Sequence, residues 1–188
     1  MTTSAPRQHG ATLLEFALAL PVFLLLMLGL IEYGRLMFVW NALQEVSRRA
    51  ARGAVLSDFS DAAAMQQVRL RALLRVDQDA LPLAPAVSSA NIRIEYLWMD
   101  AAGNLAPLPL LPACPLANRI NCARDAQGPA CIRFVRVRLC GAGPACAPLP
   151  YAGLLPAPYL PVPPHLPAAT TLAPAESLGY VPGQAPCP

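Results

Sequence analysis

The feature that most constrains this chain is its longest apolar run, Ala11 to Ile31, near the N-terminus. As an α-helix this run would extend about 31 Å, close to the thickness of a bilayer's hydrocarbon core. It contains one acid, Glu15, and one proline, Pro21. A buried helix of a soluble protein is the alternative, but the remaining chain is short and rich in proline, so it offers little core to surround such a helix. The run therefore predicts a transmembrane helix over 11–31.

The charge content of the chain is low, and its basic residues are spread along the sequence. Charged residues make up 13% of the 188 residues, against about 25% in an ordinary soluble domain. The 14 basic residues are all arginine, and the formal net charge is only +3. This pattern predicts surfaces that face lipid or other proteins, and it does not indicate a nucleic-acid partner.

A cleaved secretory signal is the competing interpretation of the N-terminal segment. Its leader carries Arg7, as a signal peptide would, but the apolar run is longer than the usual 7–15 residues or so. The string LGLIEYGR that follows contains no small-x-small cleavage site. We therefore expect the helix to remain attached to the mature chain.

The residues just before and inside the run, HGATLLEF, place Glu15 five positions after Gly10. A carboxylate near the centre of a bilayer costs about 2.5–3.5 kcal/mol, so it favours a partner charge, although an acid this early in the helix also suits the helix dipole. The string resembles the processing site of type IV pilins and pseudopilins, which a prepilin peptidase cuts after the glycine. The resemblance implies cleavage between Gly10 and Ala11 and loss of the leader, 1–10. In a filament, the new α-ammonium of a neighbouring Ala11 would then be the partner of Glu15.

Helical periodicity continues beyond the apolar run to about Ala54. One apolar stripe recurs at spacings of three and four, through Leu36, Val39, Trp40, Leu43, Val46, Ala50 and Gly53. On the opposite face, Glu45 can pair with Arg48 or Arg49.

The string GATLLEFALALPVFLLLMLGLIEYGRLMFVWNALQEVSRRAARGAV resembles the N-terminal module of TadE-like proteins, pseudopilins of the tight-adherence (Flp-type) pilus system. The closing segment TTLAPAESLGYVPG is similar to the C-terminal end of such proteins. The resemblance implies a minor, membrane-anchored subunit needed for pilus assembly. It implies as partners a prepilin peptidase, other pilin and pseudopilin subunits and an inner-membrane assembly platform, with the membrane lipid around the helix.

The EYGR string, Glu32 to Arg35, is typical of that module and also has a simpler explanation. Glu32 and Arg35 lie three apart on one helix face and can pair, while Tyr33 suits the aromatic belt of a membrane interface. Gly34 allows another helix to come close. Interfacial anchoring and a helix assembly contact account for these residues equally well.

The rest of the chain predicts a pilin-like α+β fold, with a long helix packed on a small antiparallel sheet. A second helix is expected to start at an N-cap of Asp58 or Ser60 and to end near Arg75. Alternating patterns predict strands at 91–99 and 131–140, and a turn at 100–104. The extracytoplasmic head is expected to span 32–147. Prolines are then dense enough to predict an extended tail over 148–188.

The cysteines all lie in the C-terminal half: Cys114, Cys122, Cys131, Cys140, Cys146 and Cys187. Cys140 and Cys146 are placed to close a local loop, and Cys114 with Cys122 or Cys131 would staple the loop between the strands. The sequence cannot choose among the possible pairings. No C-x-x-C occurs, and the two histidines, His9 and His165, lie in the leader and the tail, so disulfides are favoured over a metal site.

Two arguments about the orientation of the membrane helix outweigh a third, which points the opposite way. Cysteines after the apolar run fit an oxidising compartment, and peptidase access requires a cytoplasmic leader. The positive-inside rule points the other way, because Arg35, Arg48 and Arg49 follow the run and only Arg7 precedes it. We expect a single-pass protein of the bacterial inner membrane with a cytoplasmic N-terminus and a periplasmic head.

The sequence indicates a structural role. It contains no Gly-rich phosphate loop, no HExxH and no G-x-S-x-G, so we expect no enzyme activity and no cofactor. The alternative function is an unprocessed, signal-anchored binding module, in which a disulfide-rich head recognises a ligand and the helix is only a tether.

Overall fold

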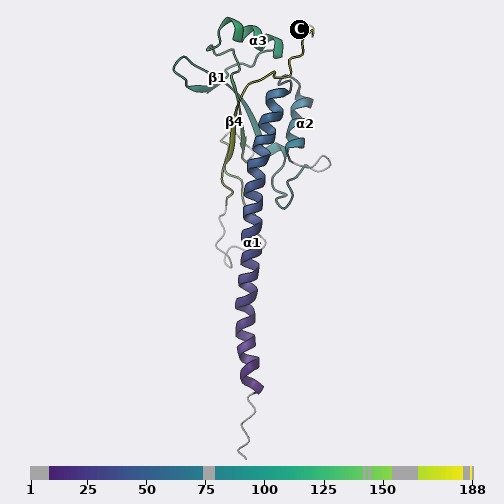
Figure 1. Ribbon diagram of the computed structural model, residues 1–188, viewed down its shortest axis with the longest axis vertical. Helices are drawn as coiled ribbons and strands as arrows, with labels where there is room; N and C mark the ends of the chain where they lie inside the picture. The colour runs from purple at the N-terminus through teal and green to yellow at the C-terminus, as the bar shows by residue number, and fades with distance from the viewer. Residues whose placement is uncertain are drawn as a thin grey trace, which may run out of the picture. The chain divides into compact units, whose positions relative to one another are not determined.

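The computed structural model describes residues 9–73, 79–141, 143, 145–153, 165–183 and 187. The chain separates into two compact units. The first unit comprises Met1–Phe38 and Gly153–Val162, and the second comprises Val39–Ala152 and Pro163–Pro188. The elements shown in Figure 1 are α1 (His9–Leu56), α2 (Ala62–Ala72), β1 (Ile92–Met99), β2 (Leu105–Pro107), α3 (Pro115–Arg124), β3 (Phe134–Leu139) and β4 (Ala169–Pro174).

In the first unit, α1 presents the predicted apolar run as an exposed helix surface. Its most apolar stretch of 18 residues has a mean hydropathy of 2.5, and no residue of that stretch is buried. The helix continues through Pro21 without ending. This part of α1 is therefore a candidate single-pass membrane anchor, as the run predicts.

The second unit is built on a four-stranded antiparallel sheet in the order β2-β1-β3-β4. One face of the sheet is apolar, with Val135 and Val137 of β3 fully buried. From α1, Val39 and Val46 are fully buried in the same core. The Oγ atoms of Ser47 and Thr171 lie 2.8 Å apart and link α1 to β4. The predicted α+β arrangement, a long helix packed on a small antiparallel sheet, is confirmed.

The predicted apolar stripe of α1 is buried except at Trp40, which is exposed, and Gly53, which is half-buried. Leu36, Leu43 and Ala50 are buried as expected, but Trp40 is 42% exposed. The buried row instead includes Ala42 and Ser47. Trp40 lies about 100° around the helix from Val39, at the edge of this row, so its indole stays partly exposed.

The predicted N-cap of the second helix is wrong: α2 is capped by Asp61. The Oδ1 atom of Asp61 accepts hydrogen bonds from the backbone N–H groups of Ala63 and Ala64, at 2.8 and 3.2 Å. Asp58 instead closes the preceding turn by accepting from the N–H and the hydroxyl of Ser60. The predicted end of the helix near Arg75 lies outside the described residues.

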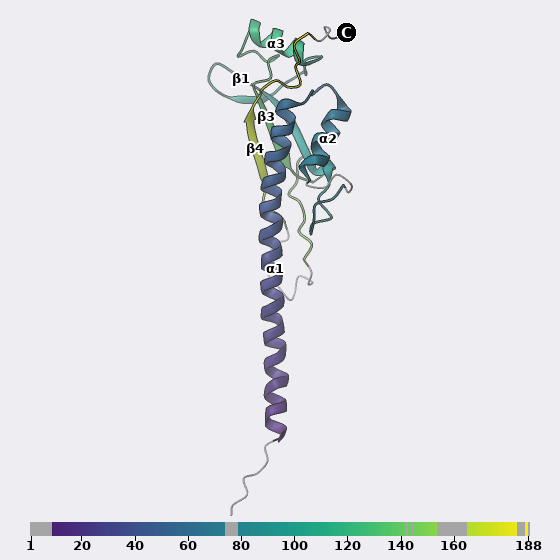
Figure 2. The same cartoon turned by 45° about the vertical axis from the view of Figure 1, so that its right-hand side comes forward.

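The helix α2 packs beside the C-terminal end of α1, as Figures 1 and 2 show. The hydroxyl of Tyr96 on β1 donates to the sulfur of Met65 at 3.2 Å, which ties α2 to the sheet. Burial raises the pKa of Tyr96 to about 12. The phenol therefore keeps the proton that it donates throughout the physiological range.

The predicted strands and turn are present, and besides a single 3-10 turn, η1 (Ser89–Asn91), three further elements were not expected. The strands β1 and β3 fall within 91–99 and 131–140, and Asp100–Asn104 form the turn between β1 and β2. The additional elements are β2, α3 and β4. Since β4 lies within the proline-rich tail, that part of the tail belongs to the sheet, where it forms an edge strand. The position agrees with the rule that proline-rich sequence does not form central strands.

The opposite face of the sheet carries a cross-strand cluster of charges. Glu95 of β1 accepts hydrogen bonds from Arg136 and Arg138 of β3, with 2.7 Å between its Oε2 and Arg136 Nε. Its side chain is 19% exposed and the two arginines are about one-third exposed. The pair positions follow from the antiparallel register, in which Glu95 lies opposite Arg136 and Arg93 opposite Arg138.

Glu95→Gln is expected to lower the free energy of unfolding by about 1–2 kcal/mol at pH 7. The substitution removes charge-assisted hydrogen bonds and leaves Arg136 and Arg138 side by side on β3 without a carboxylate between them. Burial alone would raise the pKa of Glu95, but hydrogen bonds from Arg138 and Arg136 outweigh burial and lower it. A carboxyl with a lowered pKa stabilises the fold above its unfolded pKa, about 4.3, and loses that effect as the pH falls through the folded value. The difference between variant and wild type should therefore shrink from pH 7 to pH 3 in urea unfolding.

The matched control is Glu45→Gln, which removes an ion pair with Arg49 in which both side chains are about half exposed. Solvent screens such a pair, so its loss should leave the urea midpoint unchanged. A Glu95→Gln deficit that stays constant between pH 7 and pH 3 would contradict the role assigned to the Glu95 carboxylate.

Candidate functional site

The predicted cleavage position lies in the first turn of α1, which begins at His9. Gly10 and Ala11 are both helical, and the Ala11 side chain is exposed. The first N–H groups of a helix have no partner within the helix, so the Gly10–Ala11 bond is in its least constrained turn. Cutting this bond would leave Ala11 as the new first residue of the helix. The rest of the predicted leader, 1–8, lies outside the described residues.

Glu15 lies one helical turn after Ala11, and its side chain is exposed. Its neighbours along the chain, Leu14 and Phe16, are also exposed, each at 63%. Among the described residues, Glu15 takes part in no ion pair. The structure thus places a single carboxylate on the apolar helix surface, near the predicted new N-terminus.

Glu32 and Arg35 form an ion pair, as their spacing allows. Arg35 Nη1 lies 3.5 Å from Glu32 Oε1, and the Glu32 side chain is only 2% exposed. Between them, Tyr33 is 61% exposed, and a Cβ added to Gly34 would meet nothing within 4 Å. The EYGR string therefore combines a buried ion pair with an open glycine face, which suits both interfacial anchoring and a helix contact.

The six cysteines form three disulfides: Cys114–Cys187, Cys122–Cys131 and Cys140–Cys146. The local Cys140–Cys146 pairing is confirmed. The expected pairing of Cys114 with Cys122 or Cys131 is wrong. Cys114 is the N-cap residue of α3 and binds near the end of the chain, whereas Cys122 and Cys131 join α3 to the segment before β3.

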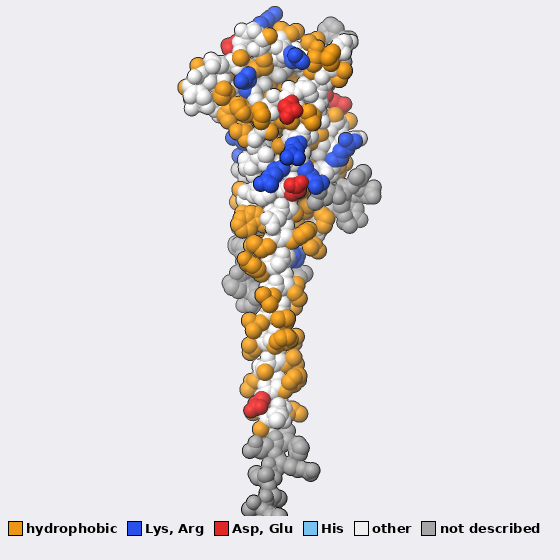
Figure 3. Space-filling view, in the orientation of Figure 1, with side chains coloured by type: hydrophobic (Ala, Val, Ile, Leu, Met, Phe, Trp, Pro, Cys, Tyr) orange, Lys and Arg blue, Asp and Glu red, His pale blue; other side chains and the backbone are white. Residues whose placement is uncertain are grey.

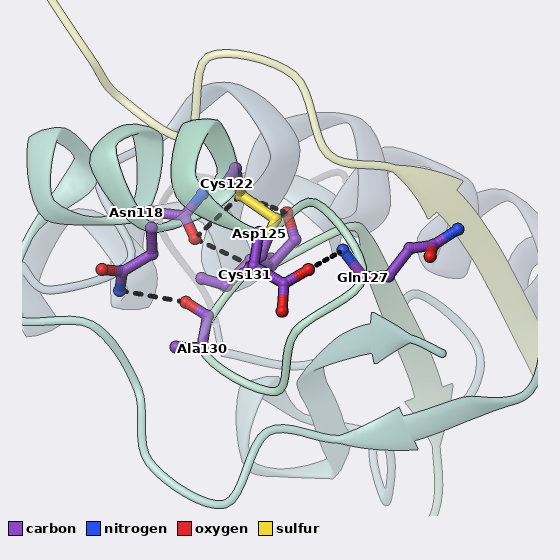
Figure 4. The surroundings of a disulfide bond; sticks show 8 residues. Asn118, Cys122, Asp125, Gln127, Ala130 and Cys131 are labelled. Atoms are coloured by element: carbon purple, nitrogen blue, oxygen red, sulfur yellow. Dashed lines mark hydrogen bonds between the residues drawn. A yellow bond between two sulfur atoms is a disulfide. The ribbon is translucent and has the colours of Figure 1, made fainter. Parts of the chain in front are cut away.

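Figure 4 shows how the Cys122–Cys131 disulfide is supported. Asn118 Oδ1 accepts from the backbone N–H of Ile132 at 2.8 Å, and Asn121 Nδ2 donates to the carbonyl of Ala130 at 3.1 Å. The side chain of Asp125 accepts from the N–H of Gln127 and closes the turn after α3. The covalent bond and these polar contacts hold α3 against the start of β3.

The closing segment, 170–183, has a structural role in the second unit. After β4, the backbone N–H of Leu178 donates to the carbonyl of Val55 at 2.9 Å, and the Leu178 side chain is buried. Gly179 has a φ of +83° and passes against the backbone of Asp58. The ring of Tyr180 lies 4.3 Å from the guanidinium carbon of Arg119. This segment therefore connects the end of α1, the sheet and α3.

The described residues hold no candidate metal centre: no three His, Cys, Asp or Glu side chains come together there. All six cysteines are used in disulfides. In the part of the chain that the structure describes, we identify no residue set that would hold a cofactor.

A family model described as TadE-like protein matches residues 10–52. The N-terminal segment of this chain is TadE-like. The TadE-like segment covers most of α1 and includes Glu15, Glu32 and Arg35, while the sheet and the disulfides lie outside it. No curated protein and no solved structure matches the chain. The TadE-like segment and the candidate membrane anchor together indicate a membrane protein associated with the tight-adherence pilus.

Proposed function

We propose that this chain is a minor pseudopilin of a tight-adherence pilus, a structural and assembly subunit with no catalytic role. In this proposal a prepilin peptidase removes residues 1–10, and the subunit then assembles with other pilins through α1. The observation that carries the proposal is the TadE-like match over α1, whose exposed apolar run, 11–31, has one carboxylate, Glu15, a single turn from the predicted cut. The inner-membrane assembly platform would be a further partner.

The assembly step follows from the cost of leaving Glu15 unpaired in an apolar environment. A carboxylate at membrane depth needs a cationic partner or access to water. Cleavage after Gly10 would create an α-ammonium on Ala11, with a pKa of about 8, so it would be largely charged at neutral pH. A neighbouring helix packed side by side would bring its ammonium to Glu15 and neutralise both charges within the apolar layer.

The proposed topology is a single pass through the inner membrane, with the N-terminus in the cytoplasm and the second unit in the periplasm. Three disulfides in the second unit support an oxidising compartment. Of the arginines that follow the apolar run, Arg35 is paired with Glu32 and Arg49 with Glu45. Ion pairing reduces the cost of moving these two arginines across the membrane.

Co-expression with a prepilin peptidase tests the proposal. The purified chain is expected to begin at Ala11, and intact mass with N-terminal sequencing measures this. Gly10→Val should block the cut, because a branched side chain would occupy the position where the resemblance requires glycine. Gly34→Val is the control, since it alters a glycine of the same helix that has open space around it and should leave processing intact.

A second arm separates processing from assembly. Glu15→Ala should still be cut after Gly10, but it should be lost from purified pili or from the assembly complex. Full-length chain in cells that make pili would overturn the proposal and leave the tethered binding module. Normal pili with Glu15→Ala would remove the proposed charge pairing.

A further inference from the structure

The helices α1 and α2 bring together five arginines that are separated in the sequence. We call them the arginine cluster: Arg48, Arg49 and Arg52 of α1 with Arg69 and Arg71 of α2. All are exposed except Arg69, which is half-buried. Figure 3 shows basic side chains gathered around an acidic one on this face of the second unit. The scattered arginines of the sequence thus become one basic surface after folding.

A glycine makes this surface possible. A Cβ added to Gly53 of α1 would lie 2.8 Å from a methyl carbon of Val68 on α2. The two helices can therefore approach closely at this point. Between them opens a pocket of about 280 Å³ with Val68 and Ala72 at its base and Arg49, Arg52 and Arg71 around it. The pocket combines an apolar floor with a cationic rim.

The positive charge of the cluster is largely uncompensated. Glu45 Oε1 accepts a hydrogen bond from Arg49 Nε at 2.7 Å, and Arg71 donates to the amide oxygen of Gln67. The side chains of Arg48, Arg52 and Arg69 form no ion pair or hydrogen bond within the described part of the chain. The hydrogen bond from Arg49, together with the charges of Arg49, Arg48 and Arg52, lowers the pKa of Glu45. The surface therefore has a positive potential that one carboxylate does not cancel.

We propose that the arginine cluster is a docking site for an acidic segment of a partner protein, with carboxylates on the arginines and an apolar side chain in the pocket. Charge complementarity selects the carboxylates, because guanidinium groups bind them in a bidentate geometry. The apolar floor favours a peptide over a lipid headgroup, because a headgroup has no apolar side chain to place against Val68 and Ala72 while its phosphate binds the arginines. This inference goes beyond the proposed function and does not depend on cleavage at Gly10.

Binding of a short, fluorescently labelled peptide of repeating Glu-Glu-Leu to the full chain in zwitterionic detergent tests the proposal. Anisotropy at low salt should show binding that weakens as salt rises, since screening acts on exposed charges. The double variant Arg52→Gln/Arg71→Gln is expected to bind about tenfold more weakly, because it removes two rim charges of the pocket. A Gln-Gln-Leu peptide should show no binding.

The matched control is Arg124→Gln/Arg133→Gln, which removes the same charge from two exposed arginines elsewhere in the second unit. It should bind the peptide as the wild type does. Equal weakening in both variants would show that only net charge matters and would overturn the site. Binding to phosphatidylglycerol vesicles with none to the peptide would also overturn it, in favour of a lipid surface. Either failure leaves the processing test of the proposed function unaffected.

Discussion

Replacing Cys114 and Cys187 with serine is expected to lower the free energy of unfolding of the second unit by about 4 kcal/mol. The two cysteines are 73 residues apart in the sequence. Their disulfide closes a long loop in the unfolded chain, so it removes more unfolded conformations than a short bridge does. The bond also fixes the end of the chain to the start of α3, where no side chain caps the helix.

Urea unfolding without reductant measures this effect, and the matched control is Cys140→Ser/Cys146→Ser. That disulfide joins cysteines only 6 residues apart, so the same loop-closure argument gives about 2 kcal/mol. The ratio of the two losses is the informative quantity. Equal losses would contradict the loop-length argument, and an unchanged midpoint for Cys114→Ser/Cys187→Ser would show that this pair is not joined.

The parts of the fold with strong periodicity were predictable from the sequence. The apolar run and the stripe from Leu36 to Ala50 define α1, and alternation in 131–140 defines β3, because each pattern repeats over enough residues to identify its period. The short elements were not predictable in this way. Pro115 at the first position of α3 was an available signal for a helix start. Cys114 at the N-cap added no second signal, because cysteine is not a typical N-cap residue.

The strand β4 shows a different limit of the sequence. Its residues, ATTLAP, mix small apolar and polar side chains, so alternation is weak; Pro167 precedes the strand closely and Pro174 is its last residue. Pairing with β3 supplies the stability that the local pattern does not indicate. The pairing of Cys114 with Cys187 was equally hidden, since it depends on where the tail returns after β4.

The residues of the candidate site also fall into two groups, those that the sequence reveals and those that only the fold reveals. Gly10, Glu15 and the Glu32–Arg35 pair depend on spacings within one helix, and a spacing can be read directly from the sequence. The arginine cluster depends on contact between two helices at Gly53, and the pairing of Glu95 with Arg136 and Arg138 depends on strand register. Such sites become visible only when the fold brings distant residues together.

Gly179→Ala is expected to lower the free energy of unfolding of the second unit by about 3 kcal/mol or more. A φ of +83° already disfavours any residue with a Cβ, at a cost of about 1–2 kcal/mol. The added Cβ would also lie 2.5 Å from the Cα of Asp58 and against its backbone nitrogen. Since these are backbone atoms, rotating a side chain cannot relieve the overlap. The closing segment would have to move away from the end of α1, and the backbone hydrogen bond from Leu178 to Val55 would be lost.

Thermal unfolding of the intact chain measures this loss, and Gly183→Ala separates its two causes. Gly183 has a φ of +86°, almost the same as Gly179, but a Cβ there would meet nothing within 4 Å. The control therefore carries only the backbone cost, about 1–2 kcal/mol, while Gly179→Ala carries the overlap as well. A shift of several degrees more for Gly179→Ala than for Gly183→Ala is expected. Equal shifts would mean that the closing segment does not pack against Asp58.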